Sequence, residues 1–495
     1  MPEKETRSNH GNRGVDDHLV EDNISESSDE KVAIPRHLGL MGCIWHTVGT
    51  VIGTGIFISP SGILRGSSGS VGVALIFWVL CGLINTLGTL IYTELSLMFK
   101  KSGGELAFLL EGWGPGLAFL KLWMMAIVTT ASYCVQSITI AQYLLTPFFQ
   151  CSEPPVVAVQ LFAAACIIFI VAINCINVRL SSHFAAFFTV TKTFGLMVVI
   201  ATGMYNLGLG RVSNLQNAFP SGHFDVKLLP IAFYSGMFAY SGWDTALSLT
   251  EEVKRPERNI PLSLIISMTG ITIVYILANI SYLTLLSPTD IITSEAVAAD
   301  YSVLALGRWS WLIWFFVAMS AMGNLNSGTF KRGRQVFAAA RDGLFPEIMA
   351  MLSITRRTPI PAVLSLLISL VYLVEVDVIK LIQYMAFIEN IFDTMTVAVL
   401  PYYRWKHPEA DRPFKCPVIA VVIYMACQIF IMGMAFYLDP VKKSIGLVVS
   451  LSGIPVYFAF FSRRYRIKCI RPYSEKATRF LQRLFVCIHQ EKKTY

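Results

Sequence analysis

Two glycines interrupt an apolar stretch near the start of the chain, which reads Val51-Ile52-Gly53-Thr54-Gly55-Ile56-Phe57-Ile58-Ser59-Pro60. Glycine lowers the cost of leaving helical geometry, and unpaired N–H and C=O groups at membrane depth must line a cavity or meet a ligand. The positive end of the helix after the glycines can hold a carboxylate, and unwound carbonyl groups can hold an ammonium group. The stretch therefore predicts a site for a small zwitterion such as an α-amino acid. The alternative is a glycine face on which another helix packs closely.

A second apolar stretch, residues 233–245, is interrupted in the same way and reads FYSGMFAYSGWDT. It combines small residues with aromatic residues and one carboxylate, Asp244. Two broken membrane helices in corresponding positions are expected where inverted repeats place a substrate site at their interface. The pair therefore favours a binding site over helix packing alone. Phe238 and Trp243 are candidates for a gate and a pocket wall, with ordinary aromatic packing as the alternative.

Lys192 lies in the middle of a third apolar stretch, within Phe188-Thr189-Val190-Thr191-Lys192-Thr193-Phe194-Gly195. An ammonium group at that depth costs several kcal/mol on most estimates, so the side chain should face the interior of a bundle and meet carbonyl groups or an acid. We expect a fixed positive charge beside the first break, in the place of a sodium ion, and hence transport that does not depend on sodium.

Glu389 and Asp393 lie four residues apart in another apolar stretch and share a helical face. In a membrane such a face must look inward, where either carboxylate could pair with Lys192 or touch a substrate side chain. Together with Asp244 they predict a site that disfavours anionic side chains. A purely structural role for Asp393 and Glu389 is the alternative.

The composition excludes a soluble protein, because 54% of the 495 residues are hydrophobic, only 15% are charged and the mean hydropathy is +0.57. Apolar runs of helix-spanning length recur with short polar loops between them, which predicts an all-α membrane protein. The net charge of +8 does not indicate nucleic-acid binding, since the basic residues cluster beside the ends of the apolar runs.

Twelve transmembrane helices are predicted. The two broken helices are the first and the sixth, as in two five-helix repeats of opposite orientation followed by two extra C-terminal helices. The predicted helices cover residues 40–64, 71–99, 117–146, 156–177, 184–209, 228–250, 262–286, 304–330, 360–376, 378–402, 416–438 and 444–462.

The loops alternate in charge. The set that follows the even-numbered helices carries far more lysine and arginine than the other set, so both termini are predicted to be cytoplasmic. Residues 1–36 are a polar tail without apolar runs and are predicted to be disordered. Residues 37–462 are expected to form the twelve-helix transporter domain, and residues 463–495 a basic cytoplasmic tail.

Cys151 lies in a predicted external loop, where no second loop cysteine is present to pair with it. Such a cysteine suggests a disulfide bond to another chain, with a free thiol as the alternative. The sequence contains no Ser/His/Asp set, no Cys/His cluster with metal-ligand spacing and no phosphate-binding loop. We therefore expect a protein that is not an enzyme and that binds no metal and no cofactor.

Seven motifs resemble the light subunits of the heteromeric amino-acid transporters, in the amino acid–polyamine–organocation superfamily. The resemblance covers nearly the whole chain outside the tails. The motifs are VGTVIGTGIFISP (48–60), KKSGGE (100–105), FFQC (148–151), TKTFG (191–195), FYSGMFAYSGWDTALSLTEEVKRPERNIPLS (233–263), ARDGLFPE (340–347) and DRPFKCP (411–417).

This resemblance implies a LeuT-like fold and sodium-independent obligatory exchange of amino acids across the plasma membrane. It also implies a disulfide bond through Cys151 to a single-span glycoprotein heavy chain, and Lys192 in the sodium-like position. Gly53, Thr54 and Gly55 would bind the substrate carboxylate and Phe238 would gate. The full set of expected substrate-binding residues is Ile52, Gly53, Thr54, Gly55, Phe238, Ala239, Ser241, Gly242, Trp243, Asp244, Glu389 and Asn390.

The substrate class rests on fewer residues. The segment Ser241–Thr245 is similar to that of the y+L-type members, which carry cationic and neutral amino acids, whereas Glu389 and Asn390 depart from the usual family pattern. We expect neutral and also cationic substrates. The alternatives are a large neutral or aromatic amino-acid exchanger or facilitator, and, in a different class, an amino-acid receptor that does not transport.

Overall fold

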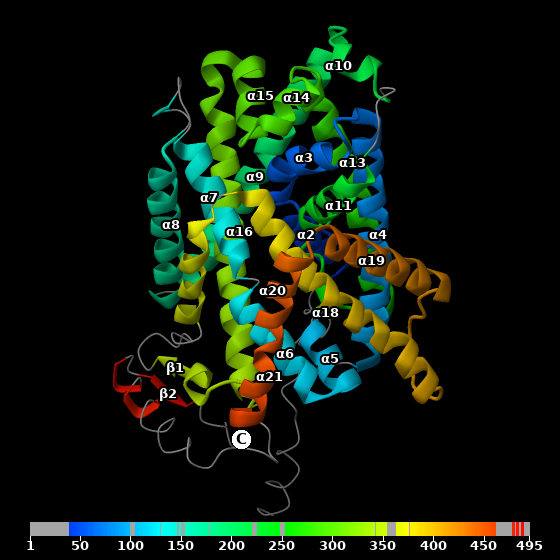
Figure 1. Cartoon of the computed structure of the whole chain (residues 1–495), viewed down its shortest axis with the longest axis vertical. Helices are drawn as coiled ribbons and strands as arrows, with labels where there is room; N and C mark the ends of the chain where they lie inside the picture. Colours follow the sequence, from blue (N-terminus) through cyan, green and yellow to red (C-terminus); the bar gives the residue numbers. More distant parts are fainter. Residues whose placement is uncertain are drawn as a thin grey trace, which may run out of the picture. The chain divides into compact units, whose positions relative to one another are not determined.

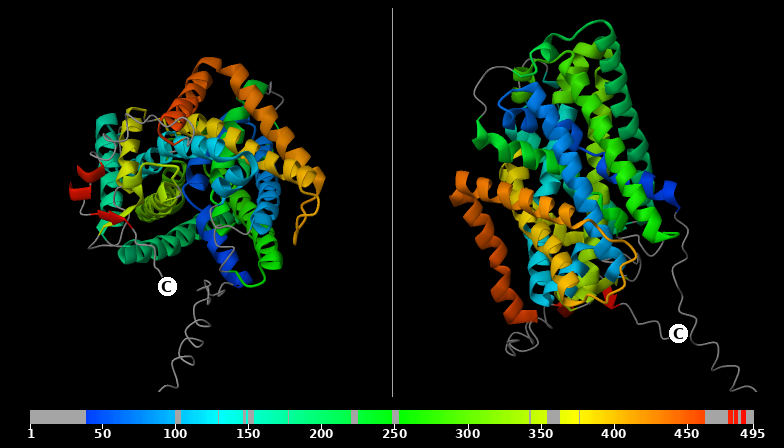
Figure 2. Two further views of the ribbon diagram at one scale, coloured as in Figure 1. Left: turned by 90° about the horizontal axis from the view of Figure 1, so that it is seen from below. Right: turned by 90° about the vertical axis from the view of Figure 1, so that its right-hand side faces the viewer.

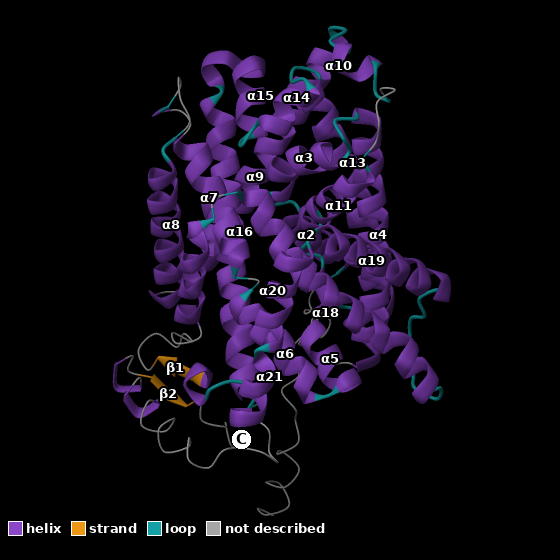
Figure 3. Ribbon diagram, in the orientation of Figure 1, coloured by secondary structure: helices purple, strands orange, loops and turns teal. Residues whose placement is uncertain are grey.

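The computed structural model describes residues 39–489, apart from 100–103, 129, 146–147, 150–153, 177, 220–224, 248–252, 342, 354–362, 376, 462–477, 481 and 485–486. The described chain is almost entirely helical (Figures 1 and 3). Cys151 and the N-terminal tail lie outside the described residues.

The first predicted helix is two helices, and so is the sixth. The first pair is α2 (Leu40–Val51) and α3 (Gly55–Gly66), which meet at a bend of 57°. The second pair is α11 (Leu229–Ala239) and the short α12 (Asp244–Leu247). Residues 52–54 are called the first break below, and residues 240–243 the second break.

Most long helices lie close to where the sequence predicts them, with three exceptions. The predicted third helix, 117–146, is two helices, Pro115–Ile127 and Ala131–Leu145, and the described part of the predicted ninth, 360–376, is a 3₁₀ helix over Ser365–Val374. The eighth helix is predicted at 304–330, but α16 spans Trp311–Arg341, because a separate helix ends before Gly307, whose φ is +53°. The other helices of this kind are α4 (Val71–Phe99), α6 (Pro115–Ile127), α7 (Ala131–Leu145), α8 (Val156–Ile176), α9 (Val178–Gly208), α13 (Pro256–Leu283), α18 (Val378–Lys406), α19 (Val418–Leu438) and α20 (Pro440–Leu451).

The shorter elements connect the long helices or extend them. They are α5 (Glu105–Trp113), α10 (Ser213–Gln216), η2 (Val226–Leu228), α14 (Pro288–Thr293), α15 (Val297–Leu306), η4 (Gly307–Trp309), η5 (Glu347–Ala350), η6 (Ser365–Val374), α21 (Gly453–Val456) and η7 (Tyr457–Phe461). Two three-residue strands, β1 (Met351–Ser353) and β2 (Cys487–His489), pair antiparallel. Within the described residues they depart from the predicted all-α fold.

Among the described residues, seven helical segments are long and apolar enough to cross a membrane, and eight if the bent pair α2–α3 is counted as one crossing. The chain is therefore a multi-pass membrane protein. The count of twelve helices, with two extra at the C-terminal end, remains a prediction. The last helices lie at the edge of the bundle in Figure 2, where α19 and α20 (orange) flank the central helices.

The centre of the bundle is built on close packing between α3 and α11. The two helices run antiparallel, and small residues face each other along their contact. An ideal Cβ at Gly62 would lie 2.2 Å from Ser235 Oγ, and one at Gly66 would lie 2.3 Å from Ala232 N. Ser59 Oγ donates a hydrogen bond of 2.7 Å to the carbonyl oxygen of Ser235. The glycine face that the sequence offered as an alternative therefore exists, on α3.

The neighbouring helices hold this centre in place. α13 packs against α2 and α4, and α16 packs against α7, α8 and α9. A hydrogen bond of 2.9 Å between the amides of Asn174 and Asn326 joins α8 to α16. Buried polar bonds of this kind fix the register of membrane helices.

Candidate functional site

The first break leaves backbone donors without partners in a buried place. Residues 51–57 are all buried. No described residue accepts a hydrogen bond from the N–H groups of Gly53, Thr54 or Gly55, which precede or open α3. The N-terminus of a helix carries a partial positive charge and favours an anion. A carboxylate placed there would satisfy donors that the fold leaves open.

The glycines at the first break are also needed for space. An ideal Cβ at Gly53 would lie 2.0 Å from Nδ2 of Asn324, on α16. One at Gly55 would lie 2.5 Å from Cα of Ala239, at the end of α11. The packing interpretation and the binding interpretation therefore both apply, because packing explains the missing side chains and the open N–H groups still lack partners.

The second break reaches the first. Gly242 has a φ of +103°, which disfavours side chains, and an ideal Cβ there would lie 2.9 Å from the carbonyl oxygen of Thr50. Ser241 is exposed although it follows a buried helix, so the second break borders open space. Its Oγ donates a hydrogen bond of 2.8 Å to the carbonyl oxygen of Phe238, whose ring is half-buried.

Tyr275 on α13 joins the two breaks. Its hydroxyl lies 3.1 Å from the carbonyl oxygen of Val51 and 3.0 Å from that of Ala239, the last residues of α2 and α11. The hydroxyl has one proton and two acceptors, so both half-helix ends depend on the same donor. Nothing in the sequence points to this residue, which is one tyrosine within an apolar run.

Lys192 contacts the last turn of α2, just before the first break, from α9. The side chain is buried, and Nζ donates a short hydrogen bond to the carbonyl oxygen of Gly49, in the last turn of α2. A cation at a helix C-terminus is favoured by the helix dipole. The partner is thus a carbonyl group, and the pairing of Lys192 with Glu389 or Asp393 that the sequence left open is not seen.

Trp243 is held in place by side chains of α4. Its indole Nε1 donates a hydrogen bond of 3.0 Å to Oδ1 of Asn85, and its ring meets that of Tyr92 edge-on with a centroid distance of 5.0 Å. Ile52 and Ala239 are buried and belong to the same hydrophobic core as Trp243. The wall next to the second break is therefore fixed by α4.

The carboxylates of the predicted site face cations. Lys331 Nζ lies 2.8 Å from Oδ2 of Asp244, and Nη2 of Arg332 lies 4.0 Å from Oε1 of Glu389. The sequence assigned Lys331 and Arg332 to a basic loop, whereas α16 continues as a helix to Arg341 and brings both into the bundle. The sequence predicts an acidic site that disfavours anionic side chains. In the structure, Lys331 and Arg332 add positive charge beside Asp244 and Glu389.

Asn390 makes its hydrogen bond elsewhere. Its Nδ2 donates to Oε1 of Gln428 on α19, and Gln428 in turn donates to the hydroxyl of Tyr424. The structure thus ties Asn390 to α19. Another ion pair, Lys121 to Glu105 at 2.8 Å, joins α6 to α5, and Glu105 also accepts from Thr396 on α18.

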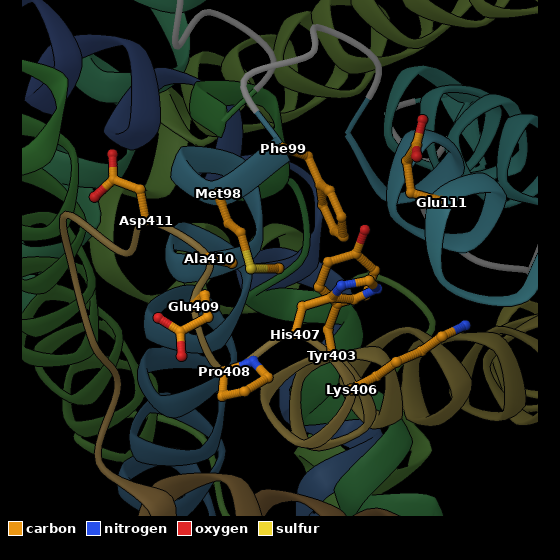
Figure 4. Close-up of a pocket in the computed structure, with 10 residues that line it drawn as sticks. All are labelled: Met98, Phe99, Glu111, Tyr403, Lys406, His407, Pro408, Glu409, Ala410 and Asp411. Atoms are coloured by element: carbon orange, nitrogen blue, oxygen red, sulfur yellow. The ribbon is translucent and has the colours of Figure 1, made fainter.

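A separate hollow of about 620 Å³ is lined by the end of α4, by Glu111 on α5, and by the end of α18 with the residues that follow it, 407–411. Figure 4 shows Phe99, Tyr403 and His407 side by side at its wall, and the ring centroids of Tyr403 and His407 are 4.6 Å apart. Beside it, Arg404 forms an ion pair with the buried carboxylate of Glu94, which also accepts a hydrogen bond of 2.6 Å from the N–H of Cys416. This hollow contains none of the residues of the two breaks.

Among the described residues no group of three or more His, Cys, Asp or Glu could hold a metal ion.

The amino acid permease family matches residues 38–461. The chain belongs to this family. The permease is 36% identical to the human cystine/glutamate transporter, over 95% of this chain and 94% of that protein. It is 35% identical to the rat large neutral amino acids transporter small subunit 2, over 98% and 92%, and 35% identical to the mouse b(0,+)-type amino acid transporter 1, over 95% and 97%.

A solved structure has the same fold. The permease superposes on the crystal structure of MhsT in complex with L-phenylalanine with a TM-score of 0.53, at 14% identity, over 83% of this chain and 98% of that one. At this identity the likeness shows the fold alone, which is the predicted LeuT-like fold. Since its relatives are membrane transporters, the permease is an amino-acid transporter and not an enzyme.

Proposed function

We propose that the permease is a sodium-independent antiporter of L-amino acids that works by alternating access. The observation that carries the proposal is the set of open N–H groups at Gly53, Thr54 and Gly55, which face a second broken helix at Ala239. These donors suit an α-carboxylate, and the carbonyl groups that end α2 and α11 suit an α-ammonium group. The substrate is thus recognised by the part that all amino acids share.

Lys192 takes the role of a fixed coupling cation. Its ammonium group already lies on the carbonyl oxygen of Gly49, so the end of α2 needs no sodium ion to balance its partial negative charge. This supports transport that is independent of sodium.

The side-chain preference is neutral in this proposal. Asp244 and Glu389 would attract cationic side chains if they stood alone, but each faces a cation of the chain itself. Transport of cationic amino acids as well, which the sequence predicts, is the second candidate, favoured by the exposed carboxylate of Asp244. The relatives named above include a cystine/glutamate transporter and a large neutral amino acids transporter, so the names of these relatives cover an anionic substrate and neutral ones.

We further propose that the permease is the light chain of a heterodimer in the plasma membrane, with both termini in the cytoplasm. Cys151 would form a disulfide bond to a single-span glycoprotein heavy chain. The support is the position of Cys151 in a predicted external loop and the name of one relative, which is a small subunit.

The test is uptake into vesicles that contain the purified full-length chain. Leucine preloaded inside should stimulate uptake of labelled leucine from outside. Replacing sodium by choline should not lower this rate of uptake. Equal uptake into empty vesicles would make the protein a uniporter. Binding without any uptake would make it a receptor.

A further inference from the structure

Lys331 is the cation that faces Asp244 in the candidate site. We propose that Lys331 is a specificity-determining residue, a tethered cation that occupies Asp244 and thereby keeps cationic amino-acid side chains out of the site. This inference rests on the proposed transport of amino acids. It names the residue that enforces the proposed preference for neutral side chains over cationic ones.

The position of Lys331 on α16 supports this role. Asn324 on the same helix covers Gly53, where the substrate carboxylate would bind. Lys331 follows Asn324 by seven residues, so the two share a helical face and lie about 10 Å apart along the helix axis. A long amino-acid side chain that starts near the first break can therefore extend toward the pair of Lys331 and Asp244.

The pair is open to such a side chain. The side chain of Asp244 is 43% exposed and that of Lys331 is 32% exposed, although both lie on helices within the bundle. The contact of 2.8 Å involves Oδ2 of Asp244, and no described residue is seen to donate a hydrogen bond to Oδ1. A ligand can thus reach the carboxylate from the side that Lys331 leaves open.

Arg332 is less suited to this role than Lys331. Its Nη1 donates a hydrogen bond of 3.2 Å to the carbonyl oxygen of Met125, and its guanidinium lies over the ring of Tyr133 at 6.0 Å. These contacts fix Arg332 between α6 and α7. Lysine instead carries a compact charge on a flexible stem, which follows the aspartate it pairs with.

The charges explain which side chains the site accepts. A cationic side chain that approaches Asp244 meets the ammonium group of Lys331, and like charges repel. An anionic side chain meets the carboxylate of Asp244. A neutral side chain meets an ion pair whose charges already compensate each other, so its entry requires no charge to be separated.

The experiment measures the ratio of lysine uptake to leucine uptake in vesicles preloaded with leucine, for the full-length chain and for Lys331→Met. We expect the substitution to raise this ratio at least about tenfold, because Asp244 then lacks a partner and a substrate ammonium group supplies one. Adding Asp244→Asn to Lys331→Met should return the ratio to the wild-type value. The control is Lys380→Met, which removes an exposed Lys–Asp pair with a contact of 3.2 Å at the start of α18 and should leave the ratio unchanged.

Several outcomes would overturn the inference while leaving the proposed function intact. In one, the wild-type protein carries lysine as fast as leucine. In another, the Lys331→Met variant still takes up leucine but gains no lysine uptake. A variant that carries neither amino acid, while Lys380→Met carries leucine, would assign Lys331 a structural role. Loss of glutamate uptake in Lys331→Met would make Lys331 a receptor for anionic side chains. If the wild-type protein itself exchanges no amino acid, the proposed function fails first.

Discussion

Gly55 at the start of α3 touches Ala239 at the end of α11, so closely that an ideal Cβ on Gly55 would lie 2.5 Å from Cα of Ala239. The two broken helices therefore meet backbone to backbone, beside the N–H groups of the first break that lack partners. Space and binding are linked at this contact, because any side chain here would separate the breaks.

Gly55→Ala should abolish leucine exchange and lower the melting temperature of the purified protein. The added methyl group meets main-chain atoms, which cannot rotate away, and overpacking of this kind costs about 1–3 kcal/mol. Gly270→Ala on α13 is the control, since nothing lies within 4 Å of an ideal Cβ there. If Gly55→Ala and Gly270→Ala have the same melting temperature and the same leucine uptake, the close contact between Gly55 and Ala239 is not needed.

Lys192→Met should slow leucine exchange by at least about tenfold, because it removes the cation from the end of α2, a contribution of order 1–2 kcal/mol when partly buried. Lys443→Met removes another buried lysine, whose Nζ donates a hydrogen bond of 3.1 Å to the carbonyl oxygen of Gln383. This control should leave the exchange rate per folded molecule unchanged. Normal turnover in Lys192→Met would show that the lysine has no part in coupling.

Tyr275→Phe should weaken the apparent affinity for leucine about fivefold, since a hydrogen bond contributes about 1 kcal/mol and both half-helix ends lose their shared donor. The measurement is the KM of leucine uptake. The control is Tyr282→Phe, two turns further along the same face of α13, where the buried hydroxyl has no hydrogen-bond partner among the described residues. An unchanged KM in Tyr275→Phe would remove Tyr275 from the site.

Cys151→Ser should abolish the high-mass band of the full-length protein on a non-reducing gel of cell membranes, while much of the exchange activity remains. The reason is that the predicted external cysteine is the one placed to bond to another chain. Cys427→Ser on α19 serves as the control, because this cysteine is free and half-buried and should leave the band in place. A band that persists without Cys151 would contradict the proposed disulfide.

Much of the helical framework could be predicted from the sequence because membrane helices are long apolar runs. The second predicted helix, 71–99, coincides with α4, and the fourth, 156–177, agrees with α8 to one residue. The prediction was wrong for α16, since hydropathy cannot show that a helix continues once charged residues begin. Lys331 and Arg332 were for that reason assigned to a loop, and the positive side of the site was missed.

The sequence by itself determined that this is a multi-pass helical membrane protein with two interrupted helices and with Lys192 buried, because apolar runs, glycines and charges at membrane depth have direct energetic meaning. The tertiary structure decided which groups meet: Lys192 with Gly49, Tyr275 with both breaks, and Lys331 with Asp244. These pairings join residues that are far apart in the chain. Their geometry depends on how whole helices pack against one another, and no local pattern records it.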